Sequence, residues 1–278
     1  MLQTNQNQAA LLTAYLNAAH QVLDAADLVC PDPLASTILG SGAESKLARL
    51  NDYFSLESLV ALRHHVALRT VLREQELAAA INSGVSQLII LAAGFDTFAF
   101  RQPEWAKAIK IFEVNDPITH NQKIQHLQAA GISIPANVAL LELPQHELQD
   151  LLNESECSTK EQTFISWLGE TMYQQKDDII GTLDSLSRFP KGSRLMLDYM
   201  LPMDENSRTL LSAISFFNQT KSPTDQYLCH FSAAEVASTL TNFGYDQVKQ
   251  LYDQSTPLLS SKGAFPGLQS FGLLVARR

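Results

Sequence analysis

The chain has 278 residues, 45% of them hydrophobic and 18% charged, a composition typical of a soluble globular protein that buries a sizeable core. Its formal net charge of −9, without any cluster of Lys and Arg, argues against nucleic acid or an anionic membrane as a partner. No apolar run approaches the ~20 residues of a membrane helix, and the N-terminus lacks the basic patch and apolar core of a signal peptide.

The three cysteines carry no pattern of a disulfide framework or a metal site. Cys30, Cys157 and Cys229 are widely spaced and odd in number. We therefore expect buried or incidental thiols in a cytoplasmic protein that holds no metal. Nothing in the sequence indicates the oligomeric state.

The first 84 residues are predicted to form a helical cap. Apolar residues at helical spacing predict a helix over 8–27, which the Pro31-Asp32-Pro33 segment ends. Asp32 is expected to cap the next helix, with Pro33 in its first turn. A long helix is predicted over 56–81, and no segment up to this point is typical of a strand.

Strands and helices alternate after Gly84. Continuous apolar runs predict buried strands over 87–92, 109–114, 138–143, 163–168 and 194–199. Helices are predicted between them over 117–130, 147–152 and 177–188. This alternation indicates right-handed crossovers and a Rossmann-like α/β core over 85–200, with a parallel sheet covered on both faces.

The last part of the chain has a different pattern. Residues 201–229 are polar and irregular, so 201–230 is interpreted as a lid insertion. A helix is predicted over 232–243, followed by strands over 246–251 and 270–276 that a Pro/Gly-rich connection joins. Without linkers or repeats, 1–278 is best interpreted as one domain, with 231–278 as its C-terminal helix and antiparallel strands.

Polar and small residues follow three of the predicted strands. Gly94 permits a tight turn after the first strand, Glu113 ends the second, and Glu142 ends the third. Ligands of open α/β sheets bind outside these strand ends, and an acid about 20 residues beyond the glycine turn is the expected partner of ribose hydroxyls. Each acid alone is more simply a solvated surface charge, but all three features together predict a nucleotide-type site.

Seven segments in order from 32 to 276 carry a resemblance to a known family. They are 32–35 (DPLA), 69–70 (RT), 87–101 (QLIILAAGFDTFAFR), 112–117 (FEVNDP), 167–173 (WLGETMY), 192–199 (GSRLMLDY) and 271–276 (FGLLVA). In these segments the chain resembles the leucine carboxyl methyltransferase family and its bacterial relatives, which include polyketide carboxyl O-methyltransferases. The resemblance implies S-adenosylmethionine as cofactor and a class I methyltransferase sheet of seven strands with an antiparallel finish.

The resemblance also implies roles for individual residues. Arg69 would pair with the carboxylate of the cofactor's methionine moiety, for which a bidentate guanidinium is suited. Tyr173 is the candidate catalytic residue, because its ring could lie near the sulfonium, and packing under the sheet edge is the equally weighted alternative. The implied cofactor-binding set is completed by the turn residues Ala92, Ala93, Gly94 and Thr97, by Glu113 and Val114 at the ribose, by Glu142 and Leu143 at the adenine, and by Leu168.

Three departures from the family pattern concern the same site. Ala92 stands where the family usually has Gly, a change that a class I site can tolerate. Asn115 stands where the family usually has Asp. Leu168 stands where it has a Glu near the cofactor's α-ammonium, and leucine cannot accept a hydrogen bond. Glu170 is not expected to compensate, because side chains of a strand alternate between its two faces.

Three functions remain open. The leading one is O-methylation of a small acceptor, a carboxylate on a specialised metabolite, which needs no general base. An exposed or core-edge role is expected for His64 and His65 rather than catalysis, although one that faced the site could serve a hydroxyl acceptor. In the second, the cofactor's own α-amine, left unpaired beside Leu168, attacks the cofactor's γ-carbon. The ring closes to azetidine-2-carboxylate, and methylthioadenosine is released. The third is a non-catalytic binding protein. The aromatic cluster of 53, 54, 216, 217 and 227 is by default packing, and otherwise an acceptor pocket.

Overall fold

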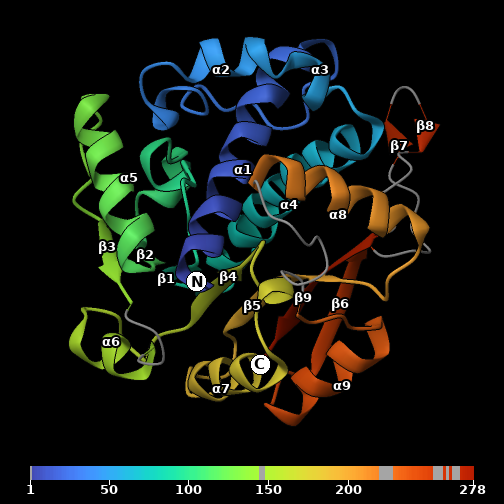
Figure 1. Ribbon diagram of the computed structural model, residues 1–278. Coiled ribbons are helices and arrows are strands. Elements are labelled where there is room, and N and C mark those ends of the chain that lie inside the picture. The colour runs from blue at the N-terminus through green and yellow to red at the C-terminus, as the bar shows by residue number, and fades with distance from the viewer. Residues whose placement is uncertain (1, 144–147, 219–227, 253–258, 261–262, 265–269) are drawn as a thin grey trace.

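The computed structural model describes residues 2–143, 148–218, 228–252, 259–260, 263–264 and 270–278 (Figure 1). Its centre is a seven-stranded sheet of order β3-β2-β1-β4-β5-β9-β6. The strands are β1 (Gln87–Leu91), β2 (Lys110–Asn115), β3 (Val138–Glu142), β4 (Thr163–Trp167), β5 (Arg194–Met200), β6 (Gln247–Tyr252) and β9 (Phe271–Arg277). The first five pair in parallel, and β9 runs antiparallel to β5 and β6. This order confirms the predicted class I methyltransferase sheet.

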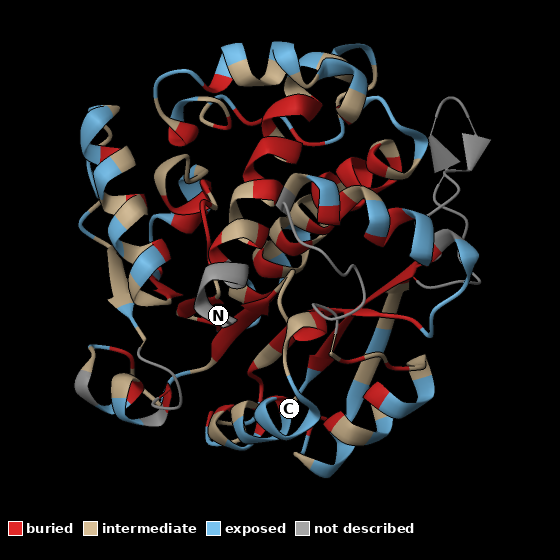
Figure 2. Ribbon diagram, in the orientation of Figure 1, coloured by how far each residue is buried: buried red, intermediate tan, exposed pale blue. Residues whose placement is uncertain are grey.

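Helices cover both faces of the sheet, which explains why its inner strands are mostly apolar and buried along their length. The helices α6 (Leu148–Glu154), α7 (Lys176–Leu186) and α9 (Ala233–Asn242) pack on one face. The long helix α4 (Glu57–Ile81) packs on the other face, and α5 (Pro117–Ala129) lies beside it on that face. Figure 2 shows the strands as the most completely buried layer, with exposed residues on the outer sides of the helices.

A helical cap stands over the carboxyl ends of the strands. Its apolar cluster joins α1 (Leu2–Leu23), α2 (Ala43–Arg49), α3 (Asn51–Phe54), the first half of α4 and α8 (Glu205–Asn218). The rings of Tyr53, Phe54 and Phe217 pack in this cap, together with the more exposed Phe216, with centroids 5.1–6.3 Å apart. The aromatic cluster is therefore packing; its fifth predicted member, residue 227, lies outside the described residues.

Short elements complete the chain. Five 3-10 helices are described, η1 (Ala25–Asp27), η2 (Thr37–Leu39), η3 (Phe98–Phe100), η4 (Glu104–Ala106) and η5 (Thr171–Tyr173), and β7 (Leu259–Ser260) pairs with β8 (Gly263–Ala264). No helix in the described ranges is long and apolar enough to cross a membrane.

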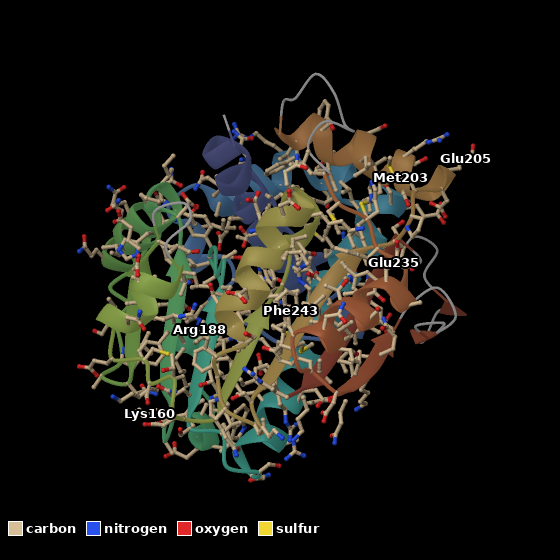
Figure 3. The ribbon with its side chains drawn as sticks, turned by 90° about the horizontal axis from the view of Figure 1, so that it is seen from below. Lys160, Arg188, Met203, Glu205, Glu235 and Phe243 are labelled. Atoms are coloured by element: carbon tan, nitrogen blue, oxygen red, sulfur yellow. The ribbon has the colours of Figure 1, made fainter. Side chains whose placement is uncertain are left out.

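Two sequence-based predictions of local structure were wrong. Residues 201–229 are not irregular throughout, because α8 occupies 205–218 and packs on α1 and α4; Glu205 at its start lies on the outer rim of the cap (Figure 3). Asp32 does not cap a helix after Pro33. Its Oδ1 instead accepts from the backbone N–H of Leu34 at 2.9 Å and closes a turn.

Gly272 in β9 provides a test of the packing between strands. A Cβ added there would overlap the ring of Tyr199, its register partner on β5, whose hydroxyl accepts from Gln250 at 2.8 Å. Because the ring is fixed, Gly272→Ala should lower the free energy of unfolding by about 2–3 kcal/mol, measured by urea denaturation.

The same substitution at Gly181 is the matched control. Gly181 lies inside α7, and a Cβ there would meet no atom within 4 Å. Gly181→Ala should therefore stabilise the fold by about 0.5–1 kcal/mol through its helix propensity. Equal effects of the two substitutions would contradict this account of the sheet.

Candidate functional site

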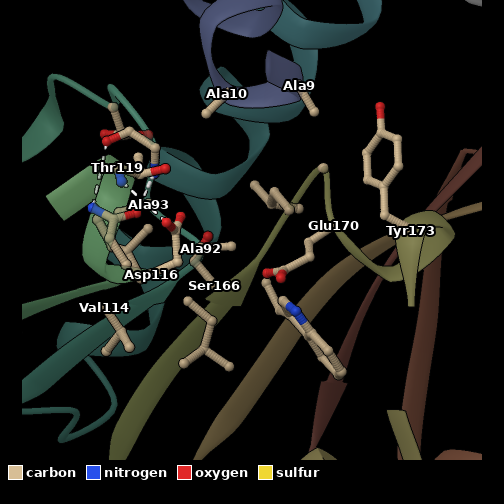
Figure 4. A pocket seen from close by; sticks show the side chains of 18 of the residues that line it. Ala9, Ala10, Ala92, Ala93, Val114, Asp116, Thr119, Ser166, Glu170 and Tyr173 are labelled. Carbon is tan, nitrogen blue, oxygen red and sulfur yellow. Dashed lines mark hydrogen bonds between the residues drawn. The ribbon is translucent and has the colours of Figure 1, made fainter. Parts of the chain in front are cut away.

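A cavity of about 550 Å³ opens at the carboxyl ends of β1, β2 and β4. Figure 4 shows Ala9 and Ala10 of α1 above it, with Ala92 and Ala93 of the turn after β1 at its side. Its walls come from α4, from the start of α5, from the segment after β4 and from α7. This is where an open α/β sheet binds its ligand, and the volume suits a nucleotide-sized molecule.

The turn after β1 brings backbone close to the cavity. Ala92 has φ of 49° and Gly94 has φ of 55°, both in the left-handed region. The N–H of Gly94 donates to Asn115 Oδ1 at 2.6 Å, which ties the turn to the end of β2. A Cβ at Gly94 would lie 3.1 Å from the Ala10 side chain, so glycine lets α1 approach. The left-handed conformation of Ala92 costs about 1 kcal/mol, a cost that a glycine at this position would not have.

Arg69 reaches the cavity wall from α4 and is held from behind by Asp198. Its Nη1 donates to Asp198 Oδ2 at 2.6 Å, and Asp198 Oδ1 accepts from the N–H of Gly169 at 2.6 Å. Burial alone would raise the pKa of Asp198, but Arg69 and a hydrogen bond from His65 lower it to about 2. The carboxylate is therefore ionised and fixes Arg69 beside the turn after β4.

Glu113, the predicted ribose acid, does not line the cavity. Its side chain is fully buried, and its carboxylate accepts from Lys123 Nζ of α5 at 2.5 Å. Glu113 is turned toward Lys123 of α5, whereas Val114 and Asn115 at the end of β2 line the cavity together with Asp116, the N-cap residue of α5. The acid that lines the cavity after β2 is thus Asp116.

Two other predicted cofactor-binding residues also lie away from the cavity. The hydroxyl of Thr97 donates to Asp32 Oδ2 at 2.5 Å and joins the turn after β1 to the cap. Glu142 at the end of β3 is exposed and outside the lining, whereas the adjacent Leu143 lines it. Of the sites proposed from the sequence, the cavity brings together Arg69, Ala92, Ala93, Gly94, Val114, Leu143, Leu168 and Tyr173.

Glu170 lines the cavity, contrary to the expectation that it would not compensate for Leu168. In a continued strand, residues 168 and 170 would share a face, so alternation gave no reason to exclude Glu170. β4 ends at Trp167, and Gly169 with φ of 78° turns the chain, so alternation no longer applies at residue 170. Glu170 Oε1 accepts from Gln174 Nε2 at 3.1 Å. Burial, with a smaller contribution from Asp116, raises the pKa of Glu170 to about 7, although hydrogen bonds from Gln174 and Trp167 act to lower it.

Three further lining features were missed in the sequence. Small residues of α1, Ala9 and Ala10 among them, form the upper side of the cavity, and the helix pattern alone does not reveal which face they occupy. The hydroxyl of Ser166 is buried in β4 and the amide oxygen Oε1 of Gln174 is buried beside Glu170; neither has a hydrogen-bond partner among the described residues. A ligand that offers donors would satisfy both atoms.

Tyr173 lies in η5, lines the cavity and also packs against the cap cluster. His64 and His65 are both buried in α4, outside the cavity lining. His65 Nε2 lies 3.2 Å from Asp198 Oδ2, and its Nδ1 lies 2.5 Å from the hydroxyl of Tyr252. The two histidines therefore belong to the interior, and His65 supports the carboxylate behind Arg69.

A possible metal group lies elsewhere, at His20, Asp24 and His64. Its ligand atoms already have partners. Asp24 accepts from Arg63 at 2.6 and 2.8 Å, and His20 Nε2 accepts from two backbone N–H groups at 3.1 and 3.3 Å. With Nε2 as acceptor, His20 Nδ1 donates to Asp24. The group is a satisfied hydrogen-bond network and does not present an open ligand set.

Comparison with known proteins relates residues 10–187 to the family model "Leucine carboxyl methyltransferase". YktD of Bacillus subtilis (strain 168), provisionally assigned as an S-adenosyl-L-methionine-dependent methyltransferase, is 30% identical over 63% of this chain and 55% of its own length. A protein of Mycobacterium sp. (strain JLS) with the same provisional assignment is 32% identical over 63% of this chain and 68% of its own. The match thus spans little more than half of the Bacillus relative.

Two solved structures share the fold. One is a provisionally assigned methyltransferase from Thermobifida fusca YX, with a TM-score of 0.59, 14% identity and coverage of 91% of this chain and 96% of that one. The other is an O-methyltransferase family protein from Burkholderia thailandensis, with a TM-score of 0.52, 14% identity and coverage of 95% and 71%.

Replacing Ala92 by Gly should stabilise the protein by about 0.5–1 kcal/mol, because glycine adopts the left-handed conformation without the steric cost of a Cβ. Ala93, which is not in that region, is the matched control, and Ala93→Gly should destabilise by a similar amount. Urea denaturation of both variants provides the measurement. A destabilised Ala92→Gly protein would argue against strain in this turn.

Glu170→Gln should change how stability depends on pH. The pKa of Glu170 is about 7 in the fold against an ordinary value of 4.5, so between these values the folded state binds more protons than the unfolded chain. Stability of the parent protein therefore falls as pH rises through this window. Relative to the parent, the variant should gain up to about 3 kcal/mol between pH 4.5 and 8, measured by urea denaturation.

A matched substitution separates this effect from general charge removal. Glu156 is exposed and outside the cavity, and its ion pair with Lys110 at 3.2 Å is exposed as well, so Glu156→Gln should change stability by less than about 1 kcal/mol. A pH-independent difference for Glu170→Gln would show that Glu170 titrates at its ordinary pKa.

Proposed function

The chain belongs to the leucine carboxyl methyltransferase family, and on that premise we propose that it transfers the methyl group of S-adenosylmethionine to a carboxylate oxygen of a small metabolite. The observation that carries the proposal is that Arg69 lines the same cavity as the turn after β1, whose residues Ala92 and Gly94 have left-handed backbone. This pairs a guanidinium, suited to a carboxylate, with close backbone approach to a ligand.

The charge of the cavity supports this cofactor. Two basic residues, Arg69 and Arg73, line it beside five acidic ones: Asp96, Asp116, Glu170, Asp177 and Asp178. Arg73 Nη1 donates to Asp96 Oδ2 at 2.6 Å, and Arg69 is paired with Asp198. The lining therefore favours a ligand with net positive charge, and S-adenosylmethionine, with a sulfonium, an ammonium and a carboxylate, is such a ligand.

Each part of the cavity has a proposed task. Arg69 would hold the carboxylate of the cofactor's amino-acid end, and the turn of Ala92 to Gly94 would lie against its sugar. Asp116 is better placed than Glu113 to accept from ribose hydroxyls, because its residue lines the cavity. Leu143 and Val114 would provide apolar contact for the adenine ring. When bound, the cofactor supplies an electrophilic methyl group.

The choice of a carboxylate acceptor follows from the kinds of general base that are missing from the described lining of the cavity. His, Cys and Lys are absent among the described lining residues. An ionised carboxylate is already a nucleophile, so the protein needs only to align it and exclude water. Tyr173 is proposed to lie near the reacting centre, where its ring could stabilise positive charge by about 0.5–2 kcal/mol.

Glu170 also bears on the competing cyclisation. That reaction was inferred from an α-amine left without a carboxylate beside Leu168. A carboxylate two residues further along the chain lines the same cavity, which removes the reason for expecting a neutral amine. We therefore favour intermolecular methyl transfer.

The test is mass spectrometry of the purified protein with S-adenosylmethionine and a panel of carboxylic acids, phenols and amines. We expect S-adenosylhomocysteine and a methyl ester, recognised because mild alkali hydrolyses it. An alkali-stable methylated product would exclude the carboxylate acceptor. Methylthioadenosine formed from the cofactor alone would indicate cyclisation, and no binding in calorimetry would favour a non-catalytic protein.

Asp198→Asn should weaken cofactor binding although Asp198 lies behind the cavity wall. The substitution keeps the shape of the side chain but leaves Arg69 without its ionised partner. Loss of one charge-assisted hydrogen bond that fixes Arg69 should raise the dissociation constant about 10-fold or more, measured by calorimetry with S-adenosylhomocysteine. Unchanged affinity would show that Arg69 keeps its position without Asp198.

A further inference from the structure

We propose that Glu170, two positions beyond the family's glutamate, binds the ammonium group at the amino-acid end of the cofactor. This inference rests on the proposed use of S-adenosylmethionine and names a binding residue for it. Leu168 lines the cavity and packs against the apolar cluster under α4. Leu168 therefore presents only apolar surface at the position where the family pattern has a carboxylate.

The turn after β4 sends the next acidic side chain into the cavity instead. Gly169 adopts φ of 78°, and its N–H donates to Asp198 Oδ1 at 2.6 Å. A Cβ at Gly169 would lie 2.8 Å from Arg69 Nη2, so the turn is fixed by the guanidinium packed against it. Figure 4 shows the carboxylate of Glu170 pointing into the cavity.

Acceptors gather around Glu170. Its carboxylate lies beside Gln174, whose Nε2 donates to it at 3.1 Å. The other end of that amide, Gln174 Oε1, is buried in the lining with no hydrogen-bond partner among the described residues. An ammonium group has three N–H donors and no acceptor, so it matches a carboxylate and an adjacent amide oxygen.

A cationic and an anionic group thus lie on consecutive parts of one turn. Arg69 packs on Gly169, and Glu170 follows it directly. An α-amino acid carries its carboxylate and its ammonium on the same carbon. Because Arg69 and Glu170 line the same cavity beside one turn, they offer partners for both charges of one amino-acid end.

Binding through Glu170 should depend on pH. Burial, with a contribution from Asp116, raises the pKa of Glu170 to about 7, and a bound ammonium would lower it. Affinity should then rise with pH up to about 8, with release of a proton below pH 7. The titratable groups that line the cavity with Glu170 are Arg69 and Arg73 of α4, Asp96, Asp116 of α5, Tyr173, and Asp177 and Asp178 of α7.

Calorimetry with two probes tests the assignment. S-adenosylhomocysteine carries the amino-acid end, whereas methylthioadenosine lacks it. Glu170→Gln should weaken S-adenosylhomocysteine binding about 10- to 100-fold and leave methylthioadenosine binding within twofold. Titrations at pH 6.5 in buffers of different ionisation enthalpy should detect proton release by the parent protein and none by the variant.

An exchange of the two positions provides the rescue. The double variant Leu168→Glu/Glu170→Leu restores the family's arrangement and should recover S-adenosylhomocysteine affinity to within about threefold of the parent. Glu156→Gln, an exposed acid outside the cavity, is the matched control and should bind both probes like the parent.

Each other outcome counts against the assignment. Unchanged S-adenosylhomocysteine affinity in Glu170→Gln, or an equal loss for methylthioadenosine, would overturn it, since the latter indicates a structural role. Failure of the parent protein to bind either probe would instead overturn the proposed function together with this inference. If both probes bind the parent but the affinities of Glu170→Gln differ from those expected, the proposed function stands and the assignment of Glu170 falls.

Discussion

The buried carboxylate of Asp198 joins the three parts of the molecule that meet at the cavity. It belongs to β5, its Oδ2 accepts from Arg69 of α4, and its Oδ1 accepts from the N–H of Gly169 after β4. A fully buried carboxylate is costly unless it is paired and hydrogen-bonded, so these donors must stay where they are. The same interactions therefore fix the direction of the Arg69 side chain, the path of the chain toward Glu170 and the position of α4 on the sheet.

The sheet could be predicted because its strands are buried on both faces. Runs such as 87–91 and 163–167 are mostly apolar and buried at every position, and turn residues mark their ends. The helix α8 could not be predicted in the same way. Its stability depends on packing against α1 and α4, and a polar outer face made its segment look irregular. The general arrangement thus follows from local patterns, whereas the cap depends on tertiary contacts.

The candidate site was predictable in its position and only in part in its residues. Arg69, Gly94 and Leu168 line the cavity, but Glu113 was chosen because it stands near a strand end, without regard to which face it occupies. Its partner Lys123 comes from α5, a long-range contact that spacing does not reveal. Glu170 was dismissed on the ground of strand alternation, although residues 168 and 170 would share a face of a strand and Gly169 signalled a turn between them.

The excess of acidic side chains around the cavity has a consequence for turnover. Methyl transfer converts a sulfonium into a neutral thioether, so the spent cofactor carries one positive charge fewer than the fresh one. An acid-lined cavity whose arginines are already paired attracts the charged form more strongly than the neutral one. In the proposed reaction, the electrostatic field that favours binding of the fresh cofactor would hold the spent cofactor less tightly, so the protein's own charge would favour exchange of product for substrate.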